Sequence, residues 1–392
     1  MTDAKTAVEK HLASVSDEAV RLSHAIHADP ELGFAEHHAS ALVAATLEDA
    51  GFAVRTGVAD LPTAVSASYG NGELVIGLFA EYDALPGIGH ACGHNIIASA
   101  AVTAGLLLAP VADDLGITVK VFGTPGEENL GGKAVMLQKG AFDGLHAAMM
   151  VHPAPVDAVG LTSMAVDHLI VEYAGQTAHA SAAPQLGRNA ADAFTIAQVA
   201  IGLLRQHLPA GVQVHGIVTD GGEAPNVVPG HTAGGFYIRG DTSELIHEAR
   251  PRIERCFEAG ALATGCELSI RPESPRYESL ACDAGMNALY KANAQALGRA
   301  FPDLPAGMRG GSTDMGNVSQ VIPTIHPALG LECAGAVNHQ PEFTAVSGAP
   351  TGDKAVLDGA LALAWTAIDL ATIADQRSRL LARPALLERK GE

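Results

Sequence analysis

The chain has little positive charge. It carries 24 lysines and arginines against 43 aspartates and glutamates, which gives a net charge of −19. Because a protein binds the phosphates of nucleic acids through a basic surface, this balance excludes a nucleic-acid partner. The acidic excess is typical of a solvated surface and indicates nothing more specific.

We also expect no segment that exports the protein or anchors it in a membrane. Its first residues show no basic start followed by an apolar block, so we expect no signal peptide and a cytoplasmic location. The most apolar run, residues 96–112, is short for a membrane span and rich in alanine and glycine. We therefore expect a buried helix there, and no membrane contact.

Cysteine is scarce and scattered. The chain has five cysteines and no C-x-x-C pair, which argues against a redox motif. A chain of this size without an export signal is expected to keep its thiols reduced. Four of the cysteines are interpreted as small core residues. Cys92 differs from them, because it lies in the polar stretch "EYDALPGIGHACGHN".

The length and the apolar pattern predict two domains. A chain of 392 residues exceeds what one core usually holds, and a hydrophobic content of 48% is typical of a globular protein. Near-continuous apolar runs at 73–80, 117–123 and 147–151 alternate with helical patterns. This alternation predicts an α/β fold, with a mainly parallel sheet covered on both faces.

A second kind of pattern interrupts the first. Between about 167 and 278 the predicted elements follow the order β-α-β-β-α-β, which is typical of a ferredoxin-like α+β unit. The remainder of the chain returns to the α/β pattern, with a strand predicted near 321–331. We therefore predict a first domain built from 1–166 and 279–392, with 167–278 inserted into it.

Each of the three apolar runs of the first domain ends in residues whose side chains can bind metal ions or transfer protons. In open α/β sheets, ligands bind outside the carboxyl ends of the strands. The sequence therefore predicts that the side chains at these three ends converge on one crevice. These side chains are Glu81 and Asp83, Glu127 and Glu128, and His152.

Cys92 and His94 form a C-x-H pair with a glycine between them. A tight turn can bring both donors to one metal ion, and thiolate and imidazole suit zinc and other late divalent metals. Two alternatives remain open from the residues alone: a cysteine nucleophile, and a helix start where the histidines cap and the cysteine packs. The neighbouring carboxylates favour the interpretation that Cys92 and His94 bind a metal ion.

The adjacent pair Glu127 and Glu128 can divide two roles. One carboxylate can bind the ion while the other accepts a proton from water.

The ordered motifs of this chain resemble the dinuclear-metal aminoacylase/carboxypeptidase G peptidase family. The motifs are "HACGH", "GTPGEENLGGK", "HP", "GQTAHAS", "APNVVPG", "GSTD" and "NHQPEF", in this order. The resemblance extends from about residue 20 to 370. The chain is most similar to the amidohydrolase branch, which includes hippurate hydrolase and aminobenzoyl-glutamate hydrolase. The resemblance implies a metallopeptidase domain with an inserted lid and dimerisation domain, and a homodimer.

The resemblance also implies a set of roles. It implies two divalent metal ions per subunit, with zinc expected first and manganese, cobalt or nickel as alternatives. The metal ligands by this resemblance are Cys92, His94, Glu128, His152 and His339. Glu127 matches the general base, and Asp83 matches the acidic residue that supports a ligand.

Three further matches fall in the inserted domain. His179 resembles the histidine that stabilises the developing oxyanion, often from the partner subunit. Asn226 and Arg239 resemble the residues that hold the carboxylate of the substrate, a task that suits a guanidinium. Asp314, in "GSTD", is expected either to order the loop under the site or to cap a helix.

These matches predict hydrolysis of the amide of an N-acyl amino acid or dipeptide-like small molecule with a free carboxylate. The metals would activate water, and Glu127 would accept its proton. The short "GIG" between "DALP" and "HACGH" is more similar to the aminobenzoyl-glutamate hydrolase and β-alanyl-dipeptide dipeptidase side of the branch. Two hypotheses of other classes compete, namely a cysteine hydrolase that uses Cys92 and a protein that binds acyl amino acids without cleaving them.

Overall fold

The computed structural model describes residues 3–305 and 307–383, and the chain divides into two compact units. Unit 1 comprises Met1–Thr162 and Leu280–Glu392, and unit 2 comprises Ser163–Ser279. The predicted inserted segment, 167–278, falls within unit 2. The predicted segments 1–166 and 279–392 also include residues 1–2, 306 and 384–392, which lie outside the described residues.

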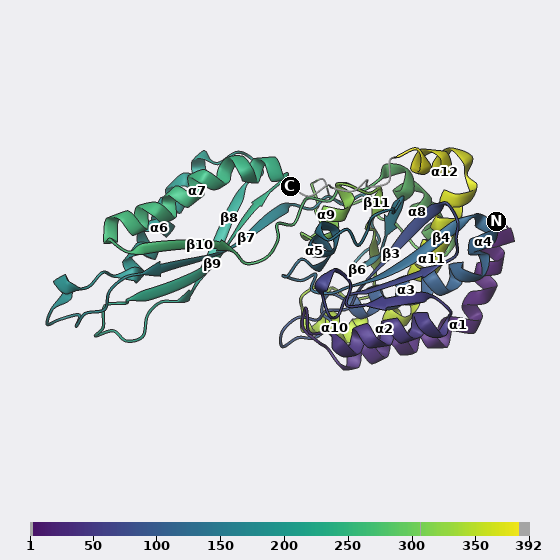
Figure 1. Ribbon diagram of the computed structural model, residues 1–392, viewed down its shortest axis with the longest axis horizontal. Helices are drawn as coiled ribbons and strands as arrows, with labels where there is room; N and C mark the ends of the chain where they lie inside the picture. Colours follow the sequence, from purple (N-terminus) through teal and green to yellow (C-terminus); the bar gives the residue numbers. More distant parts are fainter. Residues whose placement is uncertain (1–2, 306, 384–392) are drawn as a thin grey trace. The chain divides into compact units, whose positions relative to one another are not determined.

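Unit 1 is built on a six-stranded sheet in the order β1-β2-β4-β3-β5-β11 (Figure 1). Its strands are β1 (Ala53–Thr56), β2 (Val65–Tyr69), β3 (Leu74–Glu81), β4 (Ile117–Thr124), β5 (Ala147–Met149) and β11 (Thr324–Ile325). The pairs β4-β3, β3-β5 and β5-β11 are parallel, whereas β1 and β2 join antiparallel. A small parallel sheet pairs β6 (His152–Ala154) with β12 (Ala328–Gly330). The carboxyl ends of β3, β4 and β5 therefore lie at one edge.

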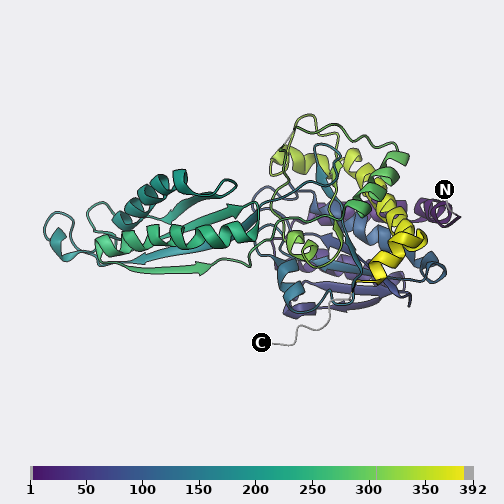
Figure 2. The same cartoon turned by 90° about the horizontal axis from the view of Figure 1, so that it is seen from above.

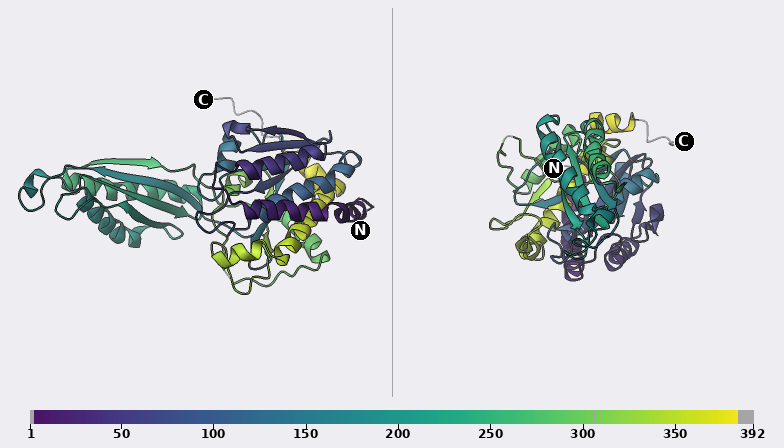
Figure 3. Two further views of the ribbon diagram at one scale, coloured as in Figure 1. Left: turned by 90° about the horizontal axis from the view of Figure 1, so that it is seen from below. Right: turned by 90° about the vertical axis from the view of Figure 1, so that its left-hand side faces the viewer.

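Helices cover both faces of this sheet. Those of unit 1 are α1 (Asp3–Ala28), α2 (His37–Asp49), α3 (His94–Leu108), α4 (Ala112–Leu115), α5 (Gly132–Gln138), α8 (Ala284–Ala296), α9 (Met315–Ser319), α10 (Pro341–Ser347), α11 (Pro350–Thr372) and α12 (Ala374–Leu381). Short 3₁₀ helices occupy Val58–Asp60 and Ala109–Val111. The first two helices lie along one side of the unit (Figure 3).

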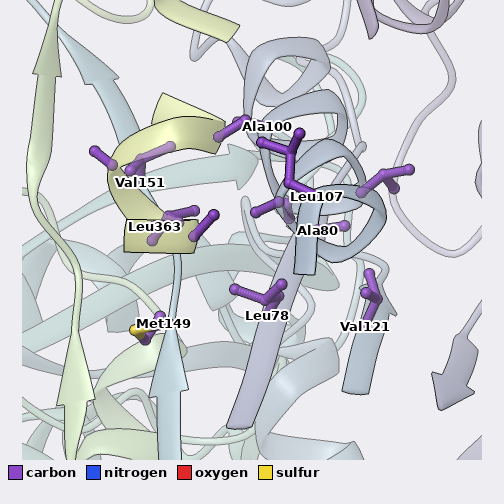
Figure 4. Close-up of a cluster of buried hydrophobic side chains, with 14 of the residues drawn as sticks. Leu78, Ala80, Ala100, Leu107, Val121, Met149, Val151 and Leu363 are labelled. Atoms are coloured by element: carbon purple, nitrogen blue, oxygen red, sulfur yellow. The ribbon is translucent and has the colours of Figure 1, made fainter. Parts of the chain in front are cut away.

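The main core lies between the sheet and the helices α1, α3 and α11. Alternate residues of β3, such as Leu78 and Ala80, face α3, and Leu363 of α11 joins the same cluster (Figure 4). By length and composition alone, His94–Leu115 and Pro350–Thr372 could cross a membrane, but most of each segment is buried inside the unit. The expected buried helix over 96–112 is therefore confirmed for most of its length, and its apolar composition is explained by core packing.

Unit 2 has a four-stranded antiparallel sheet in the order β10-β7-β9-β8, with two helices on one face (Figures 1 and 2). Its elements are β7 (Ala165–Ala174), α6 (Ala190–Leu204), β8 (Gln213–Asp220), β9 (His231–Gly240), α7 (Ser243–Thr264) and β10 (Glu267–Pro272), with 3₁₀ helices at Pro184–Leu186 and Arg205–His207. This order is the predicted β-α-β-β-α-β. Together with the mixed, mainly parallel sheet of unit 1, it confirms the predicted α/β fold class.

The single strand predicted near 321–331 is wrong. The structure has two short strands there, and they join different sheets, since β11 pairs with β5 and β12 pairs with β6. Pro327 lies between them and has no N–H group to donate to a continuous ladder. The strands β1 and β2 were missed, because their short and partly exposed segments carry no clear apolar run.

Candidate metal centre

Three neighbouring parallel strands bring their terminal side chains together, as the sequence predicted. Glu81 ends β3, the loop after β4 carries Glu127 and Glu128, and His152 follows β5. Around His94, the ring Nε2 lies 3.6 Å from Glu81 Oε2, 3.8 Å from Glu127 Oε2 and 3.8 Å from Glu128 Oε1. These distances confirm that the side chains at the strand ends converge on one place.

Cys92 and His94 reach this cluster through a tight turn before α3. Gly93 has φ +77°, and a Cβ built there would lie 2.8 Å from the ring of Pro153. A side chain at this position would meet both backbone strain and a clash, so glycine is required on two counts. The turn places Cys92 Sγ 3.5 Å from His152 Nε2.

Asp83 supports two parts of the cluster at once. Its Oδ1 accepts a bond from His94 Nδ1 at 2.9 Å, and its Oδ2 accepts the backbone N–H of Glu128 at 3.0 Å. Burial opposes ionisation of Asp83, but His94 and the Glu128 N–H outweigh it and lower the carboxyl pKa. Asp83 thereby fixes the His94 ring with Nε2 directed at the carboxylates, which is how carboxylates orient metal-binding histidines.

Two groups of possible metal ligands share one residue. Cys92, His94 and His152 form one group, and Cys92, Glu128 and His339 form the other. Within each group the ligand atoms lie within 4.8 Å of one another. The five predicted ligands thus fall into two adjacent sets of three, with the Cys92 sulfur common to both. Such a set of nitrogen, oxygen and sulfur donors suits zinc and related metals.

Observations on individual donors indicate that the cluster fits divalent cations. His94 Nε2 and Glu128 Oε1 are buried without a hydrogen-bond partner among the described residues. His152 Nδ1 donates to Pro153 O at 2.9 Å, so its Nε2 carries the lone pair that a metal needs. Although burial opposes it, Asp83 raises the pKa of His94 well above the usual range, so the cluster favours a positive charge.

The thiol of Cys92 is a poor nucleophile in this setting. Burial raises its pKa, and the charge of Glu128 raises it further. A cysteine hydrolase needs a thiolate stabilised by a positive environment, whereas at Cys92 burial and the charge of Glu128 outweigh the opposing effect of His94 on the thiol pKa. A bound divalent cation would reverse this balance and hold the sulfur as a thiolate. The donor chemistry therefore favours ligation over nucleophilic attack.

Glu127 lies beside the two metal groups, and it also forms a third possible group with Glu81 and His94. The residue is 5% exposed, and burial, then the charges of Glu81 and Glu128, raise its pKa well above the usual range. A raised carboxyl pKa suits a proton acceptor that must later return the proton. The geometry is compatible with the predicted role of general base.

A buried lysine that sequence reasoning missed lies beneath the cluster. Lys133 Nζ lies 2.7 Å from Glu81 Oε1 and 2.6 Å from Asp314 Oδ1. Asp314 Oδ2 also accepts the backbone N–H of Lys133 at 2.7 Å, and Asp314 makes no side-chain cap to α9. Asp314 therefore does not cap its own helix α9, but it accepts an N–H in the first turn of α5 and pairs with the Lys133 ammonium, which holds the start of α5 under the site. In the sequence, Lys133 was distinguished from other lysines only by its position directly after "EENLGG".

Two other histidines differ in their relation to the site. The ring of His326 lies 5.2 Å from that of His152, and its buried Nε2 has no hydrogen-bond partner in the part of the chain described. Sequence reasoning missed His326, although "TIHP" repeats the "VHP" pattern that marked His152. His90, expected to be structural, is buried and its Nε2 lies 3.1 Å from Ile26 O.

Within unit 2, His179 and Asn226 lie side by side. Ala180 N–H donates to Asn226 O at 2.9 Å, and His179 bridges to Val227. His179 is exposed, and its Nδ1 accepts the backbone N–H of Ala182 at 3.1 Å. A ring nitrogen that accepts such a bond carries no proton, so Nε2 bears the hydrogen of the neutral ring. His179 therefore presents an N–H donor.

Arg239 does not join this pair. It lies near the end of β9 that pairs with the start of β7, opposite Val166, whereas His231 opens β9 at the other end. Arg239 Nε instead bonds His215 Nε2 at 3.1 Å. Eight residues of extended strand separate Arg239 from His231, or about 27 Å. Within one copy of unit 2, the two predicted carboxylate-binding residues Asn226 and Arg239 are thus not brought together.

Comparison with known proteins gives a consistent result. Residues 77–360 match Peptidase family M20/M25/M40. Among curated proteins, the chain is 36% identical over 384 residues to the Xaa-Arg dipeptidase of Mus musculus, covering 94% of this chain and 86% of the relative. It is 32% identical over 284 residues to a component of the p-aminobenzoyl-glutamate hydrolase of Escherichia coli, covering 67% of this chain and 59% of the relative.

Solved structures share the fold. A dinuclear metal binding peptidase of the M20 family from Bacillus subtilis superposes with a TM-score of 0.67 at 21% identity, covering 91% of this chain and 99% of that one. A putative aminohydrolase from Staphylococcus aureus gives a TM-score of 0.72 at 21% identity, covering 93% and 98%.

Proposed function

The chain belongs to peptidase family M20/M25/M40 and is a metal-dependent amidohydrolase, and we propose that it cleaves dipeptides whose C-terminal residue keeps a free carboxylate. The observation that carries this proposal is the pair of metal-ligand groups that share Cys92 beside the buried carboxyl of Glu127. The similarity to the Xaa-Arg dipeptidase over 94% of the chain supports a dipeptide as the substrate.

The residues of the cluster have separate roles in this reaction. Two divalent ions, held by Cys92 with His94 and His152 and by Cys92 with Glu128 and His339, would polarise the scissile carbonyl and make water more acidic. Glu127 takes the proton of the attacking water and returns it to the leaving amine. Asp83 keeps the His94 ring in the required tautomer.

His179 is proposed to stabilise the oxyanion of the tetrahedral intermediate. Its Nε2 carries the hydrogen, because Nδ1 already accepts a backbone N–H. A donor directed at a developing oxyanion contributes roughly 3 kcal/mol to transition-state stabilisation. A single unit 2 cannot supply both His179 and Arg239 to one small substrate, since they lie toward opposite ends of its sheet. We therefore propose that His179 and Asn226 reach the site from the partner subunit, because Arg239 cannot join them within one copy of unit 2.

This assignment requires a homodimer, and unit 2 offers a surface for a second copy. β8 is an edge strand whose backbone can pair with another strand. Arg205, directly after α6, donates to Val214 O of β8, so α6 is the helix on the β8 side. Val199 and Leu203, one turn apart on α6, are 60% and 72% exposed. An open edge beside an apolar helix stripe suits pairing of two identical sheets, edge to edge.

A complementation experiment tests the shared site. Glu127→Gln and His179→Ala chains with different tags are co-expressed, and the mixed dimer is isolated by tandem purification. If each site takes Glu127 from one chain and His179 from the other, one of the two sites in the mixed dimer is intact. We expect about half of the wild-type activity per dimer. Activity no higher than that of either homodimer would contradict the shared site, and a monomer in light scattering would contradict the dimer.

The substrate class is tested with matched compounds. We expect metal-dependent hydrolysis of Ala-Arg, and none of the Ala-Arg amide, since the amide lacks the free carboxylate that Arg239 would bind. N-acetyl-arginine and p-aminobenzoyl-glutamate test the second candidate, N-acyl amino acids, which the similarity to p-aminobenzoyl-glutamate hydrolase favours. Binding without product in every case, with zinc, manganese or cobalt supplied, would reject the proposed hydrolase. We further propose zinc as the native metal and a cytoplasmic location.

A further inference from the structure

A segment to which the mechanism gives no role is packed against the loop that carries Glu127. This segment, "PELGFAE", spans residues 30–36. Its Glu31 O accepts the backbone N–H of Ala84, beside Asp83. Phe34 has φ +64°, an uncommon value for a residue with a side chain, and a Cβ on Gly126 would lie 2.8 Å from its ring. The strained backbone is therefore held by close contact with the catalytic loop.

Within this segment, Glu36 is a fully buried carboxyl. Its Oε1 accepts the backbone N–H of Gly126 at 2.8 Å, and its Oε2 accepts the hydroxyl of Thr63 at 2.9 Å. Burial, with a contribution from the charge of Asp83, raises the pKa of Glu36 to about 7. Burying an ionisable group lowers the stability of a protein unless hydrogen bonds compensate for its lost contact with water. The two hydrogen bonds that Glu36 accepts supply this compensation.

The two bonds to the loop bracket Glu127. Glu36 holds the N–H of Gly126, the residue before Glu127, and Asp83 holds the N–H of Glu128, the residue after it. The backbone N–H groups of the residues immediately before and after the base are thus each held by a buried carboxyl group from another part of the chain. Gly126 has φ +67°, so this backbone needs fixed partners to keep one orientation.

We propose that Glu36 is a positioning residue that sets the placement of the Glu127 carboxylate through the Gly126 N–H. This inference rests on the proposed role of Glu127 as general base. Catalytic groups must be held close to their productive geometry, and an error of about 1 Å costs about 100-fold in rate. Glu36 does not touch the substrate, so its effect falls on kcat and leaves KM and metal content unchanged.

Three variants of the metal-loaded enzyme separate positioning from a general effect on stability. Glu36→Leu keeps the bulk but leaves the Gly126 N–H unpaired, and we expect kcat to fall about 100-fold. Glu36→Gln can still accept from Gly126 and donate to the Thr63 hydroxyl, so we expect kcat within about threefold of wild type. Thr63→Val removes only the bond on the other oxygen, and we expect a lower melting temperature with kcat retained.

Amide hydrogen exchange supplies a readout that does not depend on turnover. We expect faster exchange over 126–128 in Glu36→Leu, and wild-type protection of this segment in Glu36→Gln and Thr63→Val. If the wild type hydrolyses no substrate, the proposed function is wrong. The exchange data still show in that case whether Glu36 holds the backbone of 126–128. Equal kcat in folded Glu36→Leu and wild type would overturn the inference, as would Glu36→Gln falling as far as Glu36→Leu. If Glu36→Leu does not fold, Glu36→Asp, one methylene too short to reach Gly126, takes its place.

Discussion

Glu127→Gln is expected to lower kcat by about 10²- to 10⁴-fold, the contribution typical of a positioned general base. The substitution keeps the shape of the side chain but removes its ability to accept the proton of water. Glu127 lies outside the two groups that share Cys92, so both ions should remain bound. The measurements are steady-state kinetics on a dipeptide and metal content by elemental analysis of the same preparation.

The neighbouring residue provides a matched control. Glu128 Oε2 lies 3.5 Å from His339 Nε2, and Glu128 belongs to one of the groups that share Cys92. Glu128→Gln should therefore lose metal as well as activity. Because Glu127 also forms a group with Glu81 and His94, loss of metal from Glu127→Gln would reassign this carboxylate as a ligand. Retained turnover in Glu127→Gln would remove it from the mechanism.

Cys92→Ser is expected to abolish activity by weakening the binding of both ions together. The sulfur is the one donor common to both ligand groups, and a serine hydroxyl does not ionise as a thiol does. Substitution of residues that merely support a ligand already weakens metal affinity 10- to 100-fold, so we expect a loss of more than about 100-fold here. Competition with a chromogenic chelator measures the affinity and the number of sites.

Single-group variants give the contrast for this experiment. His339 belongs to one ligand group and His152 to the other, so His339→Ala and His152→Ala should each weaken mainly one ion. If Cys92→Ser keeps two ions at wild-type affinity, the shared-sulfur arrangement is wrong. Full activity of the wild type after exhaustive chelation, with inactivation by a thiol reagent, would instead indicate a cysteine hydrolase.

Much of the site was predictable because it follows from the order of elements along the chain. Residues directly after buried parallel strands must meet at one edge of the sheet, so Glu127, Glu128 and His152 were expected to converge. The glycine in "HACGH" predicted a turn tight enough to bring Cys92 and His94 together, and Gly93 adopts it. The family resemblance supplied His339, which no local pattern marks.

Other parts of the site were not predictable, because they depend on contacts between segments far apart in the sequence. Lys133 bonds Asp314 across 181 positions, and Glu36 bonds Gly126 across 90. Neither pair produces a periodic or spaced pattern. A buried lysine or glutamate resembles a surface one in sequence, since only the surrounding fold removes it from water.

The sequence by itself determined the α/β fold with its inserted β-α-β-β-α-β unit, and the chemical type of the centre. These properties follow from hydrophobic periodicity and from which residues end each strand, and both are local. Only the tertiary structure decided that Cys92 is common to two ligand groups, that Glu36 and Asp83 bracket Glu127, and that Asn226 and Arg239 lie apart. The physical reason is that packing and hydrogen bonding fix distances between side chains, whereas spacing along the chain does not.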